Sequence, residues 1–197
     1  MTHAKAIRVG NYLLSGSTNL TNTSLDKNNE YNVLVQSAIL AESFERYLSD
    51  LIADSTQLRG TAVKDQGLTM ITDNLFFDRA VSLIESAVSG DTLDLTTYFF
   101  AYRNESDIGA KEIFDQIIAA KNRGVRTRVF LERSSNPAVN QSITESNLKV
   151  AKQFFDAGIT TIYLDPLEKI SHAKFIAVSG PAHQAALIGS TNIYRAV

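Results

Sequence analysis

Two short segments at opposite ends of the chain carry the residues whose types and spacing could do chemistry. Residues 3–19 read HAKAIRVGNYLLSGSTN, and residues 172–192 read HAKFIAVSGPAHQAALIGSTN. In each segment a histidine stands two residues before a lysine, so an extended strand would present both side chains on one face. An imidazole can act as a nucleophile or as a general acid and base, and an ammonium group can neutralise an anion beside it.

The matching order of residues in the two segments indicates an internal repeat. A given tetrapeptide such as Gly-Ser-Thr-Asn is expected roughly once in 10⁵ positions, yet it follows each His-Ala-Lys here. A single His-x-Lys would be read as an ordinary surface pair and a single GSTN as an ordinary turn, but their repetition favours a site. The candidate catalytic residues are His3, His172, Lys5, Lys174, Asn19, Asn192 and Glu30, and the candidate substrate-binding residues are Ser17, Ser190, Gly16 and Gly189.

Composition places the chain among ordinary globular proteins. Its 197 residues are 44% hydrophobic and 20% charged, with a net charge of −2, so no global basic field points to nucleic acid. The absence of cysteine excludes disulfides and thiolate metal sites. No run is long enough for a transmembrane segment, and residues 1–20 lack the features of a signal peptide. The localisation stays open, because any signal or anchor would lie upstream of Met1, which reads as an internal methionine.

The first quarter of the chain predicts a hairpin, a strand and a helix. Apolar and β-branched residues flank a turn within residues 3–14, which is typical of a β-hairpin. A strand at 31–35 and an amphipathic helix at 38–53 are expected next. Weak periodicity makes 54–66 the best linker candidate. We therefore expect the C-terminal part of a first repeat unit at 1–55, a linker at 56–66, and a second unit at 67–197 that is truncated after its GSTN.

The second unit alternates strands with helices, which predicts an α/β fold. We expect a mixed, mostly parallel sheet covered by helices on both faces, built from two incomplete repeat units. The expected strands span residues 67–71, 92–100, 125–131, 159–164, 172–178 and 185–188, and the expected helices begin near residues 73, 106 and 143. Residues 28–53 could supply the strand and helix that the second unit lacks, either within the chain or by a domain swap in a homodimer.

These motifs resemble those of the phospholipase D superfamily, the HKD phosphodiesterases. The family motif is His-x-Lys, four residues and Asp, followed by Gly-Ser-x-Asn and an acidic residue, for which Glu30 is the candidate here. The segment RGVRTRVFLE and the order of elements from residue 67 are also similar to that family. The motif Asp is replaced by Gly10 in the first copy and by Ser179 in the second, which puts catalytic efficiency in doubt more than the assignment.

The resemblance implies cleavage of a phosphodiester through a phosphohistidine intermediate, by hydrolysis or by phosphatidyl transfer. One histidine attacks phosphorus while the other protonates the leaving oxygen, so we expect His3 and His172 to face one phosphate; family analogy favours His3 as the nucleophile. The lysines and asparagines would bind the phosphoryl oxygens, and Glu30 would orient a histidine unless it is only a solvated carboxylate. The scheme needs no metal and no cofactor.

The near-neutral composition favours a phospholipid over nucleic acid as substrate. Two alternatives stay open: an endonuclease of the same superfamily, and an inactive fragment of a longer protein with two motifs. His183 is expected to be merely exposed, residues 98–100 could line a substrate channel or belong to the core, and Arg123, Arg126 and Arg128 could touch phosphate or form a solvated face.

Overall fold

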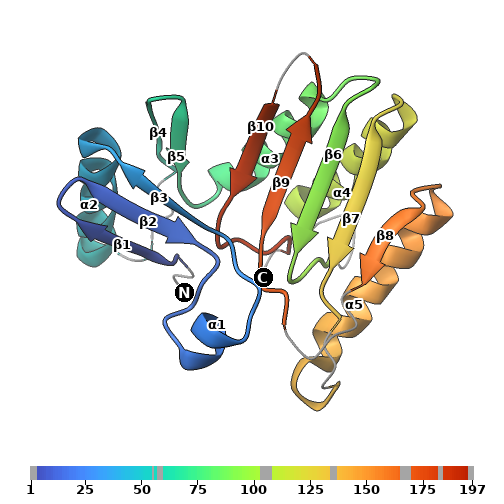
Figure 1. The fold of residues 1–197 in the computed structure, drawn as a ribbon, viewed down its shortest axis with the longest axis horizontal. Coiled ribbons are helices and arrows are strands. Elements are labelled where there is room, and N and C mark those ends of the chain that lie inside the picture. The colour runs from blue at the N-terminus through green and yellow to red at the C-terminus, as the bar shows by residue number, and fades with distance from the viewer. Residues whose placement is uncertain are drawn as a thin grey trace.

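The computed structural model describes residues 4–54, 56, 60–102, 108–133, 137–164, 170–181 and 184–194, with only the backbone at 108 and 137–140. Within them lie ten strands and five helices arranged around three sheets (Figure 1). The predicted α/β class with a mixed sheet is confirmed. His3 and His183 lie outside the described residues.

The first sheet is a small antiparallel one built from the first copy of the repeat. Its order is β1-β2-β3, with strands at Ala6–Val9, Tyr12–Gly16 and Asn32–Gln36, and a short helix α1, Asn22–Asp26, connects β2 to β3. Helix α2, Ala38–Ala53, covers one face, and its N-terminus is capped by Ser37. β3 pairs with β2 of its own copy, so within this chain residues 28–53 do not complete the second unit.

The second sheet has five strands in the order β10-β9-β6-β7-β8. β6, β7 and β8 are parallel, whereas β9 pairs antiparallel with β6 and β10 pairs antiparallel with β9. The strands span Thr92–Thr97 (β6), Arg126–Leu131 (β7), Thr161–Leu164 (β8), Phe175–Ser179 (β9) and Gln184–Ile188 (β10). The helices that connect the parallel strands are α4, Ile108–Asn122, and α5, Pro137–Asp156.

One face of the five-stranded sheet carries the hydrophobic core. Alternate residues such as Leu95, Val129 and Ile176 point from three neighbouring strands into one buried cluster. Helix α3, Leu75–Ser86, packs there together with α4 and α5, and Figure 1 shows α3 and α4 behind the sheet. A glycine at positive φ, Gly124 (φ 89°), ends the turn after α4 and returns the chain to β7.

In the part of the chain that the structure describes, α3, α4 and α5 pack on one face of the five-stranded sheet and α2 packs on the first sheet, so no helix covers the second face of the five-stranded sheet. In the repeat, Val9 corresponds to Val178 and Leu13 corresponds to Ala186. Val178 lies on the face that α3–α5 cover, whereas Leu13 lies on the face that α2 covers. Ala186, the counterpart of Leu13, lies on the opposite face of its hairpin from Val178. In terms of the repeat, α2 therefore covers the face opposite to that covered by the other helices.

A third, two-stranded sheet lies where the sequence analysis expected a linker. β4, Ala62–Asp65, and β5, Leu68–Ile71, form a hairpin whose turn residues Gln66 and Gly67 both have positive φ. Asp65 accepts a 2.6 Å hydrogen bond from the Ser37 hydroxyl, which attaches the hairpin to the N-terminus of α2. The division of the chain at 56–66 stays a proposal.

The two copies of the motif have the same backbone arrangement. The Gly16 N–H donates to the Lys5 carbonyl, and the Gly189 N–H donates to the Lys174 carbonyl, each over 3.3 Å. In both hairpins the residue after the lysine also pairs with the residue before the glycine. The sequence repeat is thus a repeat in three dimensions.

Repeat-equivalent residues nevertheless have different surroundings. Val9 is 69% exposed because no described element covers its face of β1, whereas its counterpart Val178 is 1% exposed beneath the helices. The same contrast separates Ile7, which is exposed, from Ile176, which is buried. The first sheet therefore presents an apolar face that the second sheet buries.

Lysine substitution at these two equivalent positions tests that contrast. Val9→Lys is expected to change the free energy of unfolding by no more than about 0.5 kcal/mol, because the position is on the surface. Val178→Lys is expected to lower it by about 4 kcal/mol or more, because it would bury an unpaired charge. Urea unfolding followed by circular dichroism measures both values, and equal losses would contradict the difference in covering.

Candidate functional site

The candidate site lies where the two copies of the repeat meet. The segment before β3 forms a parallel bridge with the segment before β9: the Asn29 N–H donates to the Ile170 carbonyl and the His172 N–H donates to the Asn29 carbonyl, each over 2.9 Å. Next to this bridge, the rings of Tyr31 and Phe175 pack with their centroids 5.0 Å apart. These contacts bring residues 142 positions apart into one site, and Figure 1 shows the two segments running together between the sheets.

His172 is buried and its imidazole is held by residues of the first copy. Nδ1 lies 2.9 Å from the Ser17 carbonyl oxygen and 3.2 Å from Glu30 Oε2. Both neighbours are acceptors when Glu30 is ionised, so Nδ1 carries the proton and Nε2 of the neutral ring has a lone pair. Burial lowers the pKa of His172 and the charge of Lys174 lowers it further, against the opposing effect of Glu30.

Glu30 is oriented by hydroxyl groups of its own copy. Ser17 Oγ donates to Oε2 over 2.5 Å, Ser24 donates to Oε1, and Asn28 Nδ2 lies 3.4 Å from Oε1. Burial by itself would raise the pKa of Glu30, but the hydrogen bonds from Ser17 and Ser24 and the nearby His172 outweigh it and lower the pKa. Glu30 is therefore a carboxylate at neutral pH and accepts a hydrogen bond from the Nδ1–H of His172.

Close packing explains why Gly16 and Ser17 stand before Glu30. A Cβ on Gly16 would lie 2.2 Å from the Tyr31 carbonyl oxygen, so no larger residue fits. Ser17 is fully buried, and its hydroxyl accepts a 2.9 Å hydrogen bond from the Tyr31 N–H while it donates to Glu30. Gly189 has no such neighbour, because β10 is an edge strand of the described sheet.

The two motif lysines, Lys5 and Lys174, both interact electrostatically with Glu30. Lys174 is 3% exposed, and its Nζ donates to the His172 carbonyl over 2.6 Å and lies 5.3 Å from the centroid of the Tyr98 ring. Burial lowers the pKa of Lys174 to about 7; Lys5 adds to this effect, and Glu30 opposes it. Burial likewise lowers the pKa of Lys5 against the opposing charge of Glu30. Lysines from both copies therefore act on one carboxylate.

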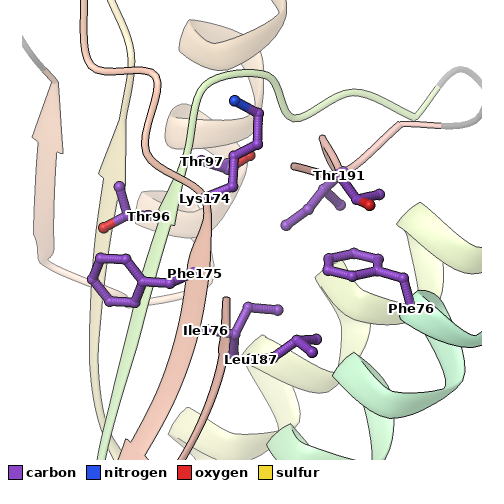
Figure 2. A pocket seen from close by; sticks show the side chains of 9 residues that line it. Phe76, Thr96, Thr97, Lys174, Phe175, Ile176, Leu187 and Thr191 are labelled. Atoms are coloured by element: carbon purple, nitrogen blue, oxygen red, sulfur yellow. The ribbon is translucent and has the colours of Figure 1, made fainter. Parts of the chain in front are cut away.

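A small cavity adjoins Lys174. Its lining is mostly apolar and includes Phe76, Ile176 and Leu187, while Thr191 comes from the second GSTN. Figure 2 shows the Lys174 stem at this cavity and its Nζ directed away from the apolar side chains. The cavity therefore desolvates the lysine stem, while the ammonium group faces the site.

The other predicted site residues are the two motif asparagines, Ser190 and His3. Asn19 is half-buried and its backbone N–H donates to Ser24 Oγ over 2.9 Å. Asn192 and Ser190 are half-buried, and Asn192 Oδ1 is buried without a hydrogen-bond partner among the described residues. His3 lies outside the described residues, so its predicted position opposite His172 stays a prediction.

The sequence analysis missed two residues that contact the candidate site. Ser24, in α1, holds Glu30, but it lay in a polar stretch with no pattern to single it out. Tyr98 was expected either to belong to the core or to line a substrate channel. Its ring packs against the ring of His172, with the two centroids 4.8 Å apart. A strand expected through residue 100 in fact ends at Thr97, which frees Tyr98 to turn toward the site.

This arrangement offers a nucleophilic or basic imidazole nitrogen close to Lys174, with Lys5 acting on the same carboxylate, which suits attack on an anionic ester. Among the described residues, no group of three or more His, Cys, Asp or Glu side chains could hold a metal ion. None of the helices described here is long and apolar enough to span a membrane.

The buried Lys174 predicts how stability depends on pH. Its pKa is about 7 in the folded chain and 10.5 ordinarily, so between these values the unfolded chain binds more protons and stability rises with pH. From pH 7 to 9.5 the free energy of unfolding is expected to rise by about 2 to 3 kcal/mol from this group. The measurement stops at pH 9.5 because of Tyr47, whose pKa is raised from 10.0 to about 12 in the folded chain by burial and Asp73. Above about pH 10 the unfolded chain loses this proton first, which lowers the free energy of unfolding.

Urea unfolding of Lys174→Met should show most of that rise removed, while the exposed control Lys152→Met should keep it. A wild-type stability that is flat between pH 7 and 9.5 would contradict the buried, readily deprotonated lysine.

Comparisons with known proteins concern the family and the fold of the chain. No curated protein matches the chain. A polyphosphate kinase from Porphyromonas gingivalis is similar in structure, with a TM-score of 0.50 over 96% of this chain and 29% of that chain. At 10% sequence identity this likeness shows the fold alone, and this chain spans less than a third of that kinase's length.

The family model described as cardiolipin synthase, PLD-like domain, matches residues 1–52 and 81–196. These ranges contain both copies of the His-x-Lys and GSTN motifs, and they cover well over half of the chain. The chain therefore belongs to this family of PLD-like domains, within the phospholipase D superfamily whose enzymes act on phosphate esters.

Proposed function

We propose that the chain forms a phosphodiesterase or phosphatidyltransferase site that works through a phosphohistidine. The observation that carries the proposal is the contact of His172 Nδ1 with Glu30 and the Ser17 carbonyl across the two copies. In this contact, residues of the first copy orient the imidazole of the second copy, as a carboxylate orients a histidine in other nucleophilic sites. Family membership supports the same chemical class.

In the proposed reaction one histidine is the nucleophile, and the other acts first as the general acid and then as the general base. Nε2 of one neutral histidine attacks phosphorus, so a P–N bond forms and the P–O bond to the leaving alcohol breaks. The second histidine, protonated at this stage, gives its proton to the leaving oxygen. It then takes a proton from water or an alcohol, whose oxygen attacks phosphorus and breaks the P–N bond. We assign His3 as the nucleophile and His172 as the acid and base. His172 is neutral in the free chain and takes up its proton when the anionic substrate binds, because the phosphodiester charge adds to that of Glu30 in favouring the imidazolium.

The lysines and asparagines are proposed to bind the phosphoryl oxygens. An anion beside Lys174 favours its ammonium form, so a phosphodiester would restore a charge that burial disfavours. Asn192 is proposed to donate its amide N–H to a phosphoryl oxygen; its buried Oδ1 has no hydrogen-bond partner among the described residues.

Two observations support a phospholipid over nucleic acid as the substrate. Arg128 is bound to Asp94 through two hydrogen bonds, and Arg123 donates to the Ile84 and Ala87 carbonyls. Two of the three arginines that could have bound a nucleic-acid backbone are therefore engaged within the fold. Leu20 and Leu25 are 76% and 61% exposed, and they flank Ser24, which holds Glu30.

Turnover of bis(p-nitrophenyl) phosphate in the presence of EDTA tests the proposed chemistry. His3→Ala, His172→Ala and Glu30→Gln are each expected to lower kcat by about 10² to 10⁴-fold, because each removes a proton-transfer or nucleophilic group or its orientation. His183→Ala, the third histidine of the chain, serves as the control and should retain activity. Turnover that persists in His172→Ala, or that disappears with EDTA, would refute the paired-histidine mechanism.

Activity on lipid vesicles tests the proposed substrate. Leu20→Ser with Leu25→Ser is expected to lower the rate on anionic phospholipid vesicles by about tenfold, because burial of the two side chains contributes about 2 kcal/mol or more at the bilayer surface. The rate on the soluble diester should not change, and Ile52→Ser, exposed on α2, is the matched control. Cleavage of single-stranded DNA with no lipid activity would favour the endonuclease.

A further inference from the structure

Glu132 is a buried carboxylate that the proposed reaction does not use. It directly follows β7 and is 1% exposed, although a charge at such a site is unfavourable unless it is well bonded. Its Oε2 accepts a 2.6 Å hydrogen bond from the Ser171 N–H. Ser171 is also buried and immediately precedes His172, so this carboxylate holds the backbone that carries the candidate catalytic imidazole.

Asn147 connects this contact to the rest of the site. It comes from α5 and is fully buried, and its Nδ2 donates to the Glu132 carbonyl over 2.8 Å and to the Tyr98 carbonyl over 2.9 Å. Its Oδ1 accepts from the Phe100 N–H over 2.9 Å. One side chain thereby joins the ends of β6 and β7, and the Tyr98 ring that it positions packs on His172 and lies near Lys174 Nζ.

The segment before β9 is therefore held from two sides. Glu132 binds Ser171 from the second unit, while the Asn29 carbonyl accepts from the next N–H, that of His172, from the first unit. The Nδ1 contacts of His172 with Ser17 and Glu30 depend on where this backbone lies. A shift on the Glu132 side would move the imidazole relative to its two acceptors.

We infer that Glu132 and Asn147 are positioning residues, which align His172 and Tyr98 through the backbone without touching the substrate. The inference rests on the proposed function for its effect on rate. It concerns residues in α5 and after β7, outside the two repeated motifs. The alternative is that both side chains only stabilise the core, and the two roles differ in what a substitution changes.

Kinetics on bis(p-nitrophenyl) phosphate, well below the unfolding temperature of each variant, separate these roles. Glu132→Ala and Asn147→Ala are expected to lower kcat by about 10- to 100-fold with KM changed less than about threefold, because small displacements of reacting groups have effects of this size. Glu132→Gln keeps an acceptor for Ser171 and is expected to restore kcat to within about threefold of the wild type. Glu145, which is exposed on α5, the helix that contains Asn147, provides the control variant Glu145→Ala.

A spectroscopic reading keeps the test independent of turnover. The chain has three histidines, so the Nδ1 proton resonance of His172 is assigned by its loss in His172→Gln. Both alanine variants are expected to shift or broaden this resonance, and Glu132→Gln is expected to keep it. If the wild type lacks turnover, the proposed function fails while the resonance still tests the alignment.

Alanine variants with lower stability but unchanged kcat and an unchanged His172 resonance would overturn the inference. Should Glu132→Ala not fold, Asn147→Ala and Glu132→Gln carry the same comparison, since Asn147→Ala leaves the carboxylate in place. Loss of the resonance in Glu145→Ala as well would also contradict a specific role for Glu132 and Asn147.

Discussion

The contact of the His172 imidazole with Glu30 and the Ser17 carbonyl is the interaction on which the rest of the candidate site depends. It links the second copy of the repeat to the first and selects the ring tautomer with a free Nε2 lone pair. Two hydroxyls keep the acid ionised, and the parallel bridge at Asn29 keeps the two segments in place. A site divided between two copies requires such a contact, because neither copy contains all the groups.

Burial of this cluster lowers the stability of the fold, but it also sets the protonation states of the candidate catalytic groups. Burying Lys174, His172 and Glu30 together is unfavourable for charged forms, and the pKa of both Lys174 and His172 is lowered by burial. A core of apolar residues in their place would be simpler to stabilise. The arrangement keeps a neutral imidazole beside a readily deprotonated lysine, and in the proposed reaction the bound phosphodiester anion would favour the charged form of both.

Much of the fold could be predicted from local patterns. The α/β class, the hairpin around Gly10 and the helix at 38–53 follow from periodicity and turn residues, and the structure has all of them. The hairpin at 62–71 could be predicted only in part, because its first strand is short and its residues are mostly polar. Helices that cover different faces of two sheets also left no local signal, since an amphipathic helix does not specify which sheet it will cover.

For the candidate site, the sequence by itself determined which residues are repeated and what chemistry those types suit, since His-x-Lys and GSTN occur twice in one order. Only the tertiary structure decided that Glu30 faces His172 of the other copy and that Lys174 is buried. It also decided that Glu132 binds the Ser171 N–H and that Asn147 binds the Glu132 carbonyl. The physical reason is that these contacts join positions far apart in the chain. Spacing along a strand predicts a shared face, but packing alone determines which distant face lies opposite.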